Sequence, residues 1–174
     1  NSSNSTTVGN TLNMNSNQVK NITQVTSTGT ITGILSGYSP AVTISNNTID
    51  NITRSGAGTF YAINYSGATT SSFTFNLNTI SNLSITSTTS TSAFYGFYSG
   101  SAPQTETWTN NTIDGLTSSS TASNSVIGIY SITATTGNKT CQNNIVKNIS
   151  LPASGTGTAY GIRILYLGAT NLFS

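Results

Sequence analysis

The chain has 174 residues, of which 5% are charged and 34% are hydrophobic, and its formal net charge is +2. Its 5 basic and 3 acidic residues are too few and too scattered for the electrostatic footprint of a nucleic-acid-binding protein. No apolar run approaches the ~18 residues of a membrane-spanning helix, so we expect neither a nucleic-acid partner nor membrane insertion. The hydrophobic residues recur at regular positions, which predicts a packed core rather than a disordered chain.

A nine-residue block returns along the chain with starts 30 to 33 residues apart, at Met14–Ile22, Ile44–Ile52, Phe75–Leu83, Trp108–Leu116 and Cys141–Ile149. The first, sixth and ninth positions of the block are always apolar. The fourth position is asparagine in every copy: Asn17, Asn47, Asn78, Asn111 and Asn144. A shorter motif follows each block, with Gly or Ala before an apolar residue: Ile34, Ile63, Phe97, Ile129 and Ile162. Self-similarity at this period predicts one structural unit stacked on itself.

Each repeat is predicted to form one coil of three short strands. In chain order, the first strand centres on the first position of the block, the second spans its sixth to ninth positions, and the third carries the Gly-Ile motif. These segments are β-branched or aromatic, are bounded by Gly and Asn, and show no sustained 3.6-residue period. The prediction is therefore an all-β fold: a parallel β-solenoid of about five turns of 30–33 residues, with turns starting near residues 14, 44, 75, 108 and 141.

The invariant asparagine is predicted to occupy one corner of every coil. Asparagine tolerates the left-handed backbone that a corner often requires. Its amide also both donates and accepts hydrogen bonds, so the five residues can form a ladder along the stack. On this interpretation, Asn78→Ala destabilises the fold, whereas Ser118→Ala, placed in a long loop, changes little.

The block "NNTIDNI" and the Gly-Ile motif that follows it resemble the right-handed parallel β-helix repeats of the pectin-lyase-like superfamily. The resemblance covers nearly the whole chain and implies a single right-handed parallel β-helix. The Asn- and Thr-rich composition is similar to that of very large secreted surface proteins of gliding, Bacteroidota-type bacteria. This second resemblance implies an extracellular or cell-surface location.

No polar cap is visible at either end of the repeats, and solenoids need such caps. Residues 1–174 are therefore expected to be one β-solenoid segment of a longer repeat protein, with a sixth turn beginning near residue 173. The expected partners of this segment are further copies of the same solenoid turns in the parent chain.

The residues that carry chemistry are sparse. Enzymes of the pectin-lyase-like superfamily use clustered acids, but the acids of this chain are Asp50, Glu106 and Asp114 alone, and it has no histidine. Asp50 and Asp114 share a column that reads Lys20, Asp50, Ser81, Asp114 and Lys147. This order predicts two exposed ion pairs, Lys20–Asp50 and Asp114–Lys147, more readily than a pair of catalytic carboxylates.

The single cysteine, Cys141, aligns with Trp108, so both side chains are predicted to lie in the core. A buried cysteine of this kind is usually inert. We therefore expect no catalytic, cofactor-binding or metal-binding residue in this chain.

Two columns are predicted to face outward. The residue after the Gly-Ile position places Tyr98, Tyr130 and Arg163 on adjacent coils, where they either bind glycans or merely stabilise an exposed face. A second column reads Asn13, Thr43, Thr74, Thr107 and Thr140, which suits either an ice-binding surface or ordinary exposed strands.

The leading functional hypothesis is a non-enzymatic, extracellular structural or adhesive segment of a large surface or filament protein. The alternative is a carbohydrate-binding β-helix module, for which surface polysaccharide is the partner. A polysaccharide-degrading enzyme and an ice-binding solenoid are the remaining hypotheses.

Overall fold

The computed structural model describes residues 11–25, 28–37, 40–66, 72–101, 103–132, 137–165 and 171–174. All regular elements in these ranges are β-strands, which confirms the all-β prediction. A helix long and apolar enough to cross a membrane is not found among these residues.

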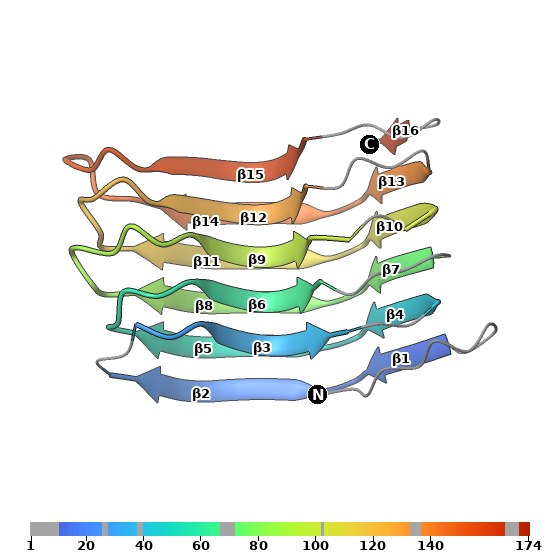
Figure 1. Ribbon diagram of the computed structural model, residues 1–174, viewed down its shortest axis with the longest axis horizontal. Coiled ribbons are helices and arrows are strands. Elements are labelled where there is room, and N and C mark those ends of the chain that lie inside the picture. Colours follow the sequence, from blue (N-terminus) through green and yellow to red (C-terminus); the bar gives the residue numbers. More distant parts are fainter. Residues whose placement is uncertain are drawn as a thin grey trace.

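The strands form three parallel sheets (Figure 1). The first sheet contains β1 (Thr11–Asn15), β4 (Ala41–Ser45), β7 (Ser72–Asn76), β10 (Thr105–Thr109), β13 (Asn138–Gln142) and β16 (Asn171–Phe173). The second contains β2 (Gln18–Gln24), β5 (Thr48–Arg54), β8 (Thr79–Ile85), β11 (Thr112–Ser118) and β14 (Ile145–Ser150). The third contains β3 (Ile31–Ser36), β6 (Phe60–Tyr65), β9 (Phe94–Ser99), β12 (Ser125–Ser131) and β15 (Thr158–Ile164).

The chain visits the three sheets in the same order on every coil, so the fold is a parallel β-solenoid. Figure 1 shows the coils stacked from β1–β3 at the bottom to β13–β15 at the top, with β16 above β13. The strand register reproduces the sequence columns: Ile44 lies opposite Met14, Trp108 opposite Phe75, and Phe173 opposite Cys141. The repeat spacing alone therefore placed residues of adjacent coils correctly.

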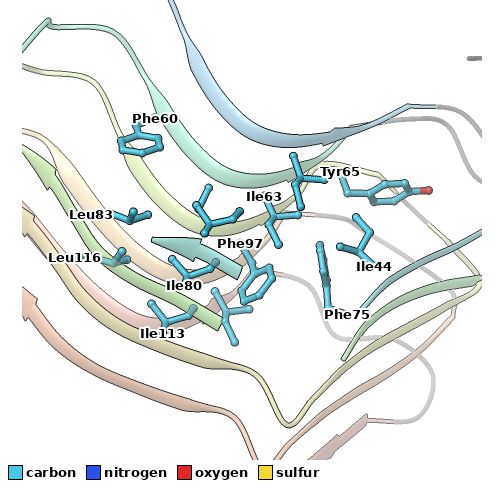
Figure 2. Close-up of a cluster of buried hydrophobic side chains, with 14 of the residues drawn as sticks. Ile44, Phe60, Ile63, Tyr65, Phe75, Ile80, Leu83, Phe97, Ile113 and Leu116 are labelled. Carbon is cyan, nitrogen blue, oxygen red and sulfur yellow. The ribbon is translucent and has the colours of Figure 1, made fainter. Parts of the chain in front are cut away.

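Apolar side chains from all three sheets meet inside the coils (Figure 2). Ile44 and Phe75 come from the first sheet, Ile80 from the second, and Ile63 and Phe97 from the third, and all are at most 1% exposed. Complete burial of one such side chain contributes about 1.5–3 kcal/mol. A coil cannot bury this face alone, so each coil depends on its neighbours. Trp108 and Cys141 are buried in the same core, as predicted.

The small residue before the Gly-Ile apolar position lets the second and third sheets approach each other. A Cβ atom added to Gly96 would lie 2.6 Å from the Gly128 carbonyl oxygen and 3.1 Å from Ile113 Cδ1. The equivalent residue of the second coil is Ala62, which is fully buried. This column therefore holds nothing larger than alanine.

The invariant asparagines form a hydrogen-bonded ladder at the corner between the first and second sheets. The backbone N–H of Asn47 and its Nδ2 both donate to Asn78 Oδ1, at 3.0 and 2.9 Å. Asn78 donates in the same way to Asn111 Oδ1, and its Nδ2 also donates to the Ile44 carbonyl at 2.8 Å. The ladder runs from Asn17 to Asn144 with the same geometry. Each interior amide is thus satisfied although it is only 1% exposed.

The predicted left-handed backbone at the invariant asparagine is wrong. The left-handed residue is the one before it: Ser16, Asn46, Leu77, Asn110 and Asn143, with φ between 54° and 59°. A second left-handed column follows at the eighth block position: Asn21, Asn51, Asn82, Gly115 and Asn148. One bend precedes the second strand of the coil and the other lies within that strand. Glycine replaces asparagine at one position of the second bend because both residue types tolerate positive φ. The invariant asparagine is thus selected by its buried amide and not by its backbone angle.

Ser118 is not a loop residue, so the prediction that Ser118→Ala changes little rests on a wrong placement. Ser118 ends β11, is 6% exposed, and its Oγ accepts hydrogen bonds from Asn124 Nδ2 at 2.9 Å and from the Ser120 N–H at 3.2 Å. Its hydroxyl organises the turn that leads into β12. Arg54 has a similar role at the end of β5, where its buried guanidinium donates to the carbonyl oxygens of Thr59 and Gly29.

Replacing Asn78 by alanine is expected to lower the free energy of unfolding by about 1–3 kcal/mol, because ladder partners on both sides lose their hydrogen bonds inside the core. Urea unfolding followed by circular dichroism measures the change. Ser123→Ala is the control, since Ser123 is exposed, and it is expected to alter stability by less than about 0.5 kcal/mol. Equal stabilities of the two variants would contradict the ladder's role.

Candidate functional site

The outer face of the third sheet carries a layer of tyrosines. Tyr98 of β9, Tyr130 of β12 and Arg163 of β15 lie in register on adjacent coils, as the column order predicted. All three side chains are partly exposed. The structure therefore brings together the three residues that the sequence singled out as a glycan-binding strip.

A second row, which the sequence reasoning missed, runs beside this strip. It consists of Thr32, Tyr61, Tyr95, Ile127 and Tyr160. Ile127 lies between Tyr95 and Tyr160 in register and is only 1% exposed, so the surrounding residues form a continuous layer over it. The signal was present in the sequence, because each residue of this row directly follows an apolar residue of the inward column.

Most of the tyrosine rings in this layer stack on one another along the solenoid. The ring centroids of Tyr61 and Tyr95 lie 5.0 Å apart with planes 12° apart, and those of Tyr95 and Tyr130 lie 5.5 Å apart with planes 7° apart. On the next coil, Arg163 Cζ lies 5.3 Å from the Tyr130 ring centroid and 4.7 Å from that of Tyr160. Tyr130 is therefore held between Tyr95 and the guanidinium group, and neither of its faces is open to a flat ligand.

Tyr98 has a different orientation. Its ring plane is turned by 63° from that of Tyr61, 55° from that of Tyr95 and 62° from that of Tyr130. The ring lies over Gly100, where an added Cβ atom would be 2.7 Å from Tyr98 Cε1. Of the tyrosines whose ring contacts the structure describes, Tyr98 is the one turned out of the stack, so it is the best placed to present a ring face.

The phenols of Tyr61, Tyr95 and Tyr98 keep their protons at neutral pH. Burial raises the pKa of Tyr95 to about 12, and the neighbouring phenols of Tyr61, Tyr130 and Tyr98 act in the same direction. Burial also raises the pKa values of Tyr61 and Tyr98. The face thus offers neutral hydroxyl groups, which donate and accept hydrogen bonds, together with the guanidinium of Arg163.

The two partly exposed acids on the second sheet each interact with side chains of the next coil. Asp114 makes the predicted ion pair with Lys147 at 3.1 Å, and its Oδ1 accepts a hydrogen bond from Asn148. Asp50 accepts hydrogen bonds from Ser81 Oγ at 2.6 Å and Asn82 Nδ2 at 2.9 Å. These hydrogen bonds are the main reason that the pKa values of both carboxyl groups lie below the usual range.

The second predicted ion pair is not observed. Lys20 and Asp50 lie in register on β2 and β5, but the salt bridges found in the described part of the chain are Lys147–Asp114 and Lys139–Glu106. Ser81 Oγ and Asn82 Nδ2 donate hydrogen bonds to Asp50 Oδ1 instead. Lys20 therefore acts on the pKa of Asp50 only as a nearby charge.

A buried charge pair was missed by the sequence analysis. Lys139 Nζ lies 3.2 Å from Glu106 Oε2, and the two side chains are 0% and 1% exposed. The pair belongs to the inward column that reads Leu12, Val42, Phe73, Glu106 and Lys139. This column lies two residues before the first position of the nine-residue block. A block that began two residues earlier would have shown two charged residues in an otherwise apolar column.

Ser131 completes a hydrogen-bonded ring with this pair. Lys139 Nζ donates to Ser131 Oγ at 2.7 Å, and Ser131 Oγ donates to Glu106 Oε2 at 2.9 Å. Burial raises the pKa of Glu106, although Lys139, Ser99 and Ser131 oppose this effect. The surrounding core therefore favours the neutral form of the Glu106 carboxyl more than water does.

The threonine column lies in register on the outer face of the first sheet, from Asn13 on β1 to Thr140 on β13. Flanking side chains hydrogen-bond along the stack, as Ser45 Oγ does to Asn15 Oδ1 and Thr109 Oγ1 does to Asn76 Oδ1. This face carries small, uncharged polar groups.

The described ranges contain no group of three or more His, Cys, Asp or Glu side chains arranged to hold a metal ion. Burial raises the pKa of the Cys141 thiol. A pocket of about 310 Å³ lies at the last coil, lined by Cys141, Asn144, Ile162, Phe173 and Ser174.

Comparison of the chain with protein-family models, curated proteins and solved structures gives no match.

Proposed function

We propose that this chain is a non-enzymatic structural or adhesive segment of an extracellular surface or filament protein. The observation that carries the proposal is the contrast between the two sides of each strand. Inside, the same asparagine and the same apolar columns recur from coil to coil. Outside, side chains vary but stay in straight rows, since the register is constant. Such a scaffold extends and presents surface at a regular spacing.

We also propose that the repeat is of the pectin-lyase-like, right-handed parallel β-helix kind, as in large secreted proteins of Bacteroidota-type bacteria. Its proposed partners are further turns of the same solenoid. The sequence resemblance and the parallel solenoid architecture support it. The low charge and the abundance of Ser, Thr and Asn support an extracellular location.

The state of the exposed acids supports the non-enzymatic part of the proposal. A glycosidase of the inverting type needs one carboxylic acid with a raised pKa beside a carboxylate. Asp50 and Asp114 both have lowered pKa values, and the coil that contains Ser81 lies between them. Neither residue therefore suits the role of proton donor.

Immunogold electron microscopy of the cells that make this protein tests the proposal. An antibody against the chain is expected to label a surface layer or thin fibres on intact cells. Pre-immune serum is the control. Label that appears only after the cells are broken open would contradict an extracellular role.

A second candidate function is carbohydrate binding by the tyrosine layer. The observation that favours it is Tyr98, the ring turned out of the stack, with the Tyr130 and Arg163 side chains on the next two coils. Aromatic faces pack against the apolar faces of sugar rings, and the phenol and guanidinium groups supply hydrogen bonds to sugar hydroxyls. Surface polysaccharide is the corresponding partner.

Retention on insoluble cellulose and on immobilised polygalacturonate measures this binding. Tyr98→Ala and the double variant Tyr98→Ala/Tyr130→Ala are expected to lose retention, whereas Tyr98→Phe keeps the ring and most of the retention. Thr74→Ala, on the outer face of the first sheet, is the control. Retention by the double variant equal to that of the wild type would remove this face as the site.

A further inference from the structure

The Glu106–Lys139 pair is unusual for this chain, which has only 8 charged residues. The pair lies in a column that is otherwise apolar in the first three coils, where Leu12, Val42 and Phe73 take the same place. Burying two opposite charges carries a large desolvation cost before their attraction is counted. An apolar pair at these positions would fill the core without that cost. Packing alone therefore does not account for the charges of Glu106 and Lys139.

The atoms around the pair are arranged for proton transfer between its members. Ser131 Oγ accepts from Lys139 Nζ at 2.7 Å and donates to Glu106 Oε2 at 2.9 Å. A proton can therefore leave the nitrogen and another can reach the carboxyl oxygen through one hydroxyl group. This relay converts an ammonium–carboxylate pair into a neutral amine and a carboxylic acid, which is the form that a dry core favours.

We propose that Lys139 and Glu106 join in an amide bond that links the fourth coil to the fifth. The lone pair of the neutral Nζ attacks Cδ of the carboxylic acid, and the Nζ–Cδ bond forms. Ser131 passes the second Nζ proton to Oε2, the Cδ–Oε2 bond breaks, and Oε2 departs as water. Oε1 remains as the amide oxygen. The step is a condensation without change of oxidation state, so it needs no oxidant or reductant.

Position and burial make this pair suitable for the reaction. Two groups held together in a fixed geometry react as if at effective concentrations of about 10⁵–10⁸ M. The two side chains are 0% and 1% exposed, so bulk water does not compete for the carbonyl carbon. The product also removes both buried charges, and with them the desolvation cost of the pair.

The chain contains an internal control for this argument. Lys147 and Asp114 lie 3.1 Å apart, which is as close as the buried pair, but their side chains are 55% and 36% exposed. This exposed pair is surrounded by water, and a hydroxyl relay like that of Ser131 is not described beside it. It is therefore expected to remain an ordinary ion pair.

Intact-mass spectrometry of the full chain, purified in the folded state and denatured for the measurement, tests the proposal. The expected mass is lower than that of the sequence by one water. Chymotrypsin cuts after Trp108 and Tyr130, between the two residues, so the bond yields a branched peptide that contains Glu106 and Lys139. Trypsin is expected to cut after Lys147 and not after Lys139. A mass equal to that of the sequence, or a water loss mapped to other residues, would overturn the proposal.

Three variants sharpen the test. Lys139→Met is expected to restore the full sequence mass, and Lys147→Met to keep the loss of one water. When newly synthesised chain is kept in denaturant and then refolded, Ser131→Ala is expected to form the bond more slowly than the wild type. Circular dichroism shows whether each variant folds, while the peptide map of the wild type decides the proposal even if Lys139→Met does not fold. Wild-type kinetics in folded Ser131→Ala would overturn the relay.

Discussion

The structure depends on one constraint: an amide buried at the same corner of every coil must find its hydrogen-bond partners in the coils above and below. Asn47, Asn78 and Asn111 meet this requirement because each Oδ1 accepts from the preceding asparagine and each Nδ2 donates to the next. A shift of one strand by a single residue would leave these groups unpaired in the core, at a cost of about 1–3 kcal/mol for each group. The ladder thereby fixes the register of the first two sheets, and the small residues of the third sheet let it close against them.

A constant interior leaves the outer columns free to differ. The third sheet carries stacked tyrosines, the first carries small polar groups, and the second carries Asn and Asp side chains that hydrogen-bond along the stack. The interior itself departs from uniformity at Glu106 and Lys139, which replace apolar residues on two adjacent coils. This departure distinguishes the fourth and fifth coils from the first three, which carry apolar residues in the same column.

The column positions were predictable from the sequence because a parallel stack places equivalent residues opposite one another. Met14, Ile44 and Phe75 needed only the repeat spacing for their placement. The backbone angle at the corner was not predictable, since asparagine also suits the adjacent left-handed position and occupies it in Asn46 and Asn110. The orientation of the Tyr98 ring could not be predicted from the sequence either, because the ring angle depends on packing against Tyr61, Tyr95 and Gly100.

Backbone hydrogen exchange, measured residue by residue by NMR, tests the ladder most directly. The amide protons of Asn47, Asn78 and Asn111 donate to side-chain oxygens and not to strand partners. They are expected to exchange as slowly as the core amides of β5, β8 and β11, because they open only when coils separate. Exchange as fast as that of the exposed residues between β8 and β9 would show that the asparagine corner does not hold the stack together.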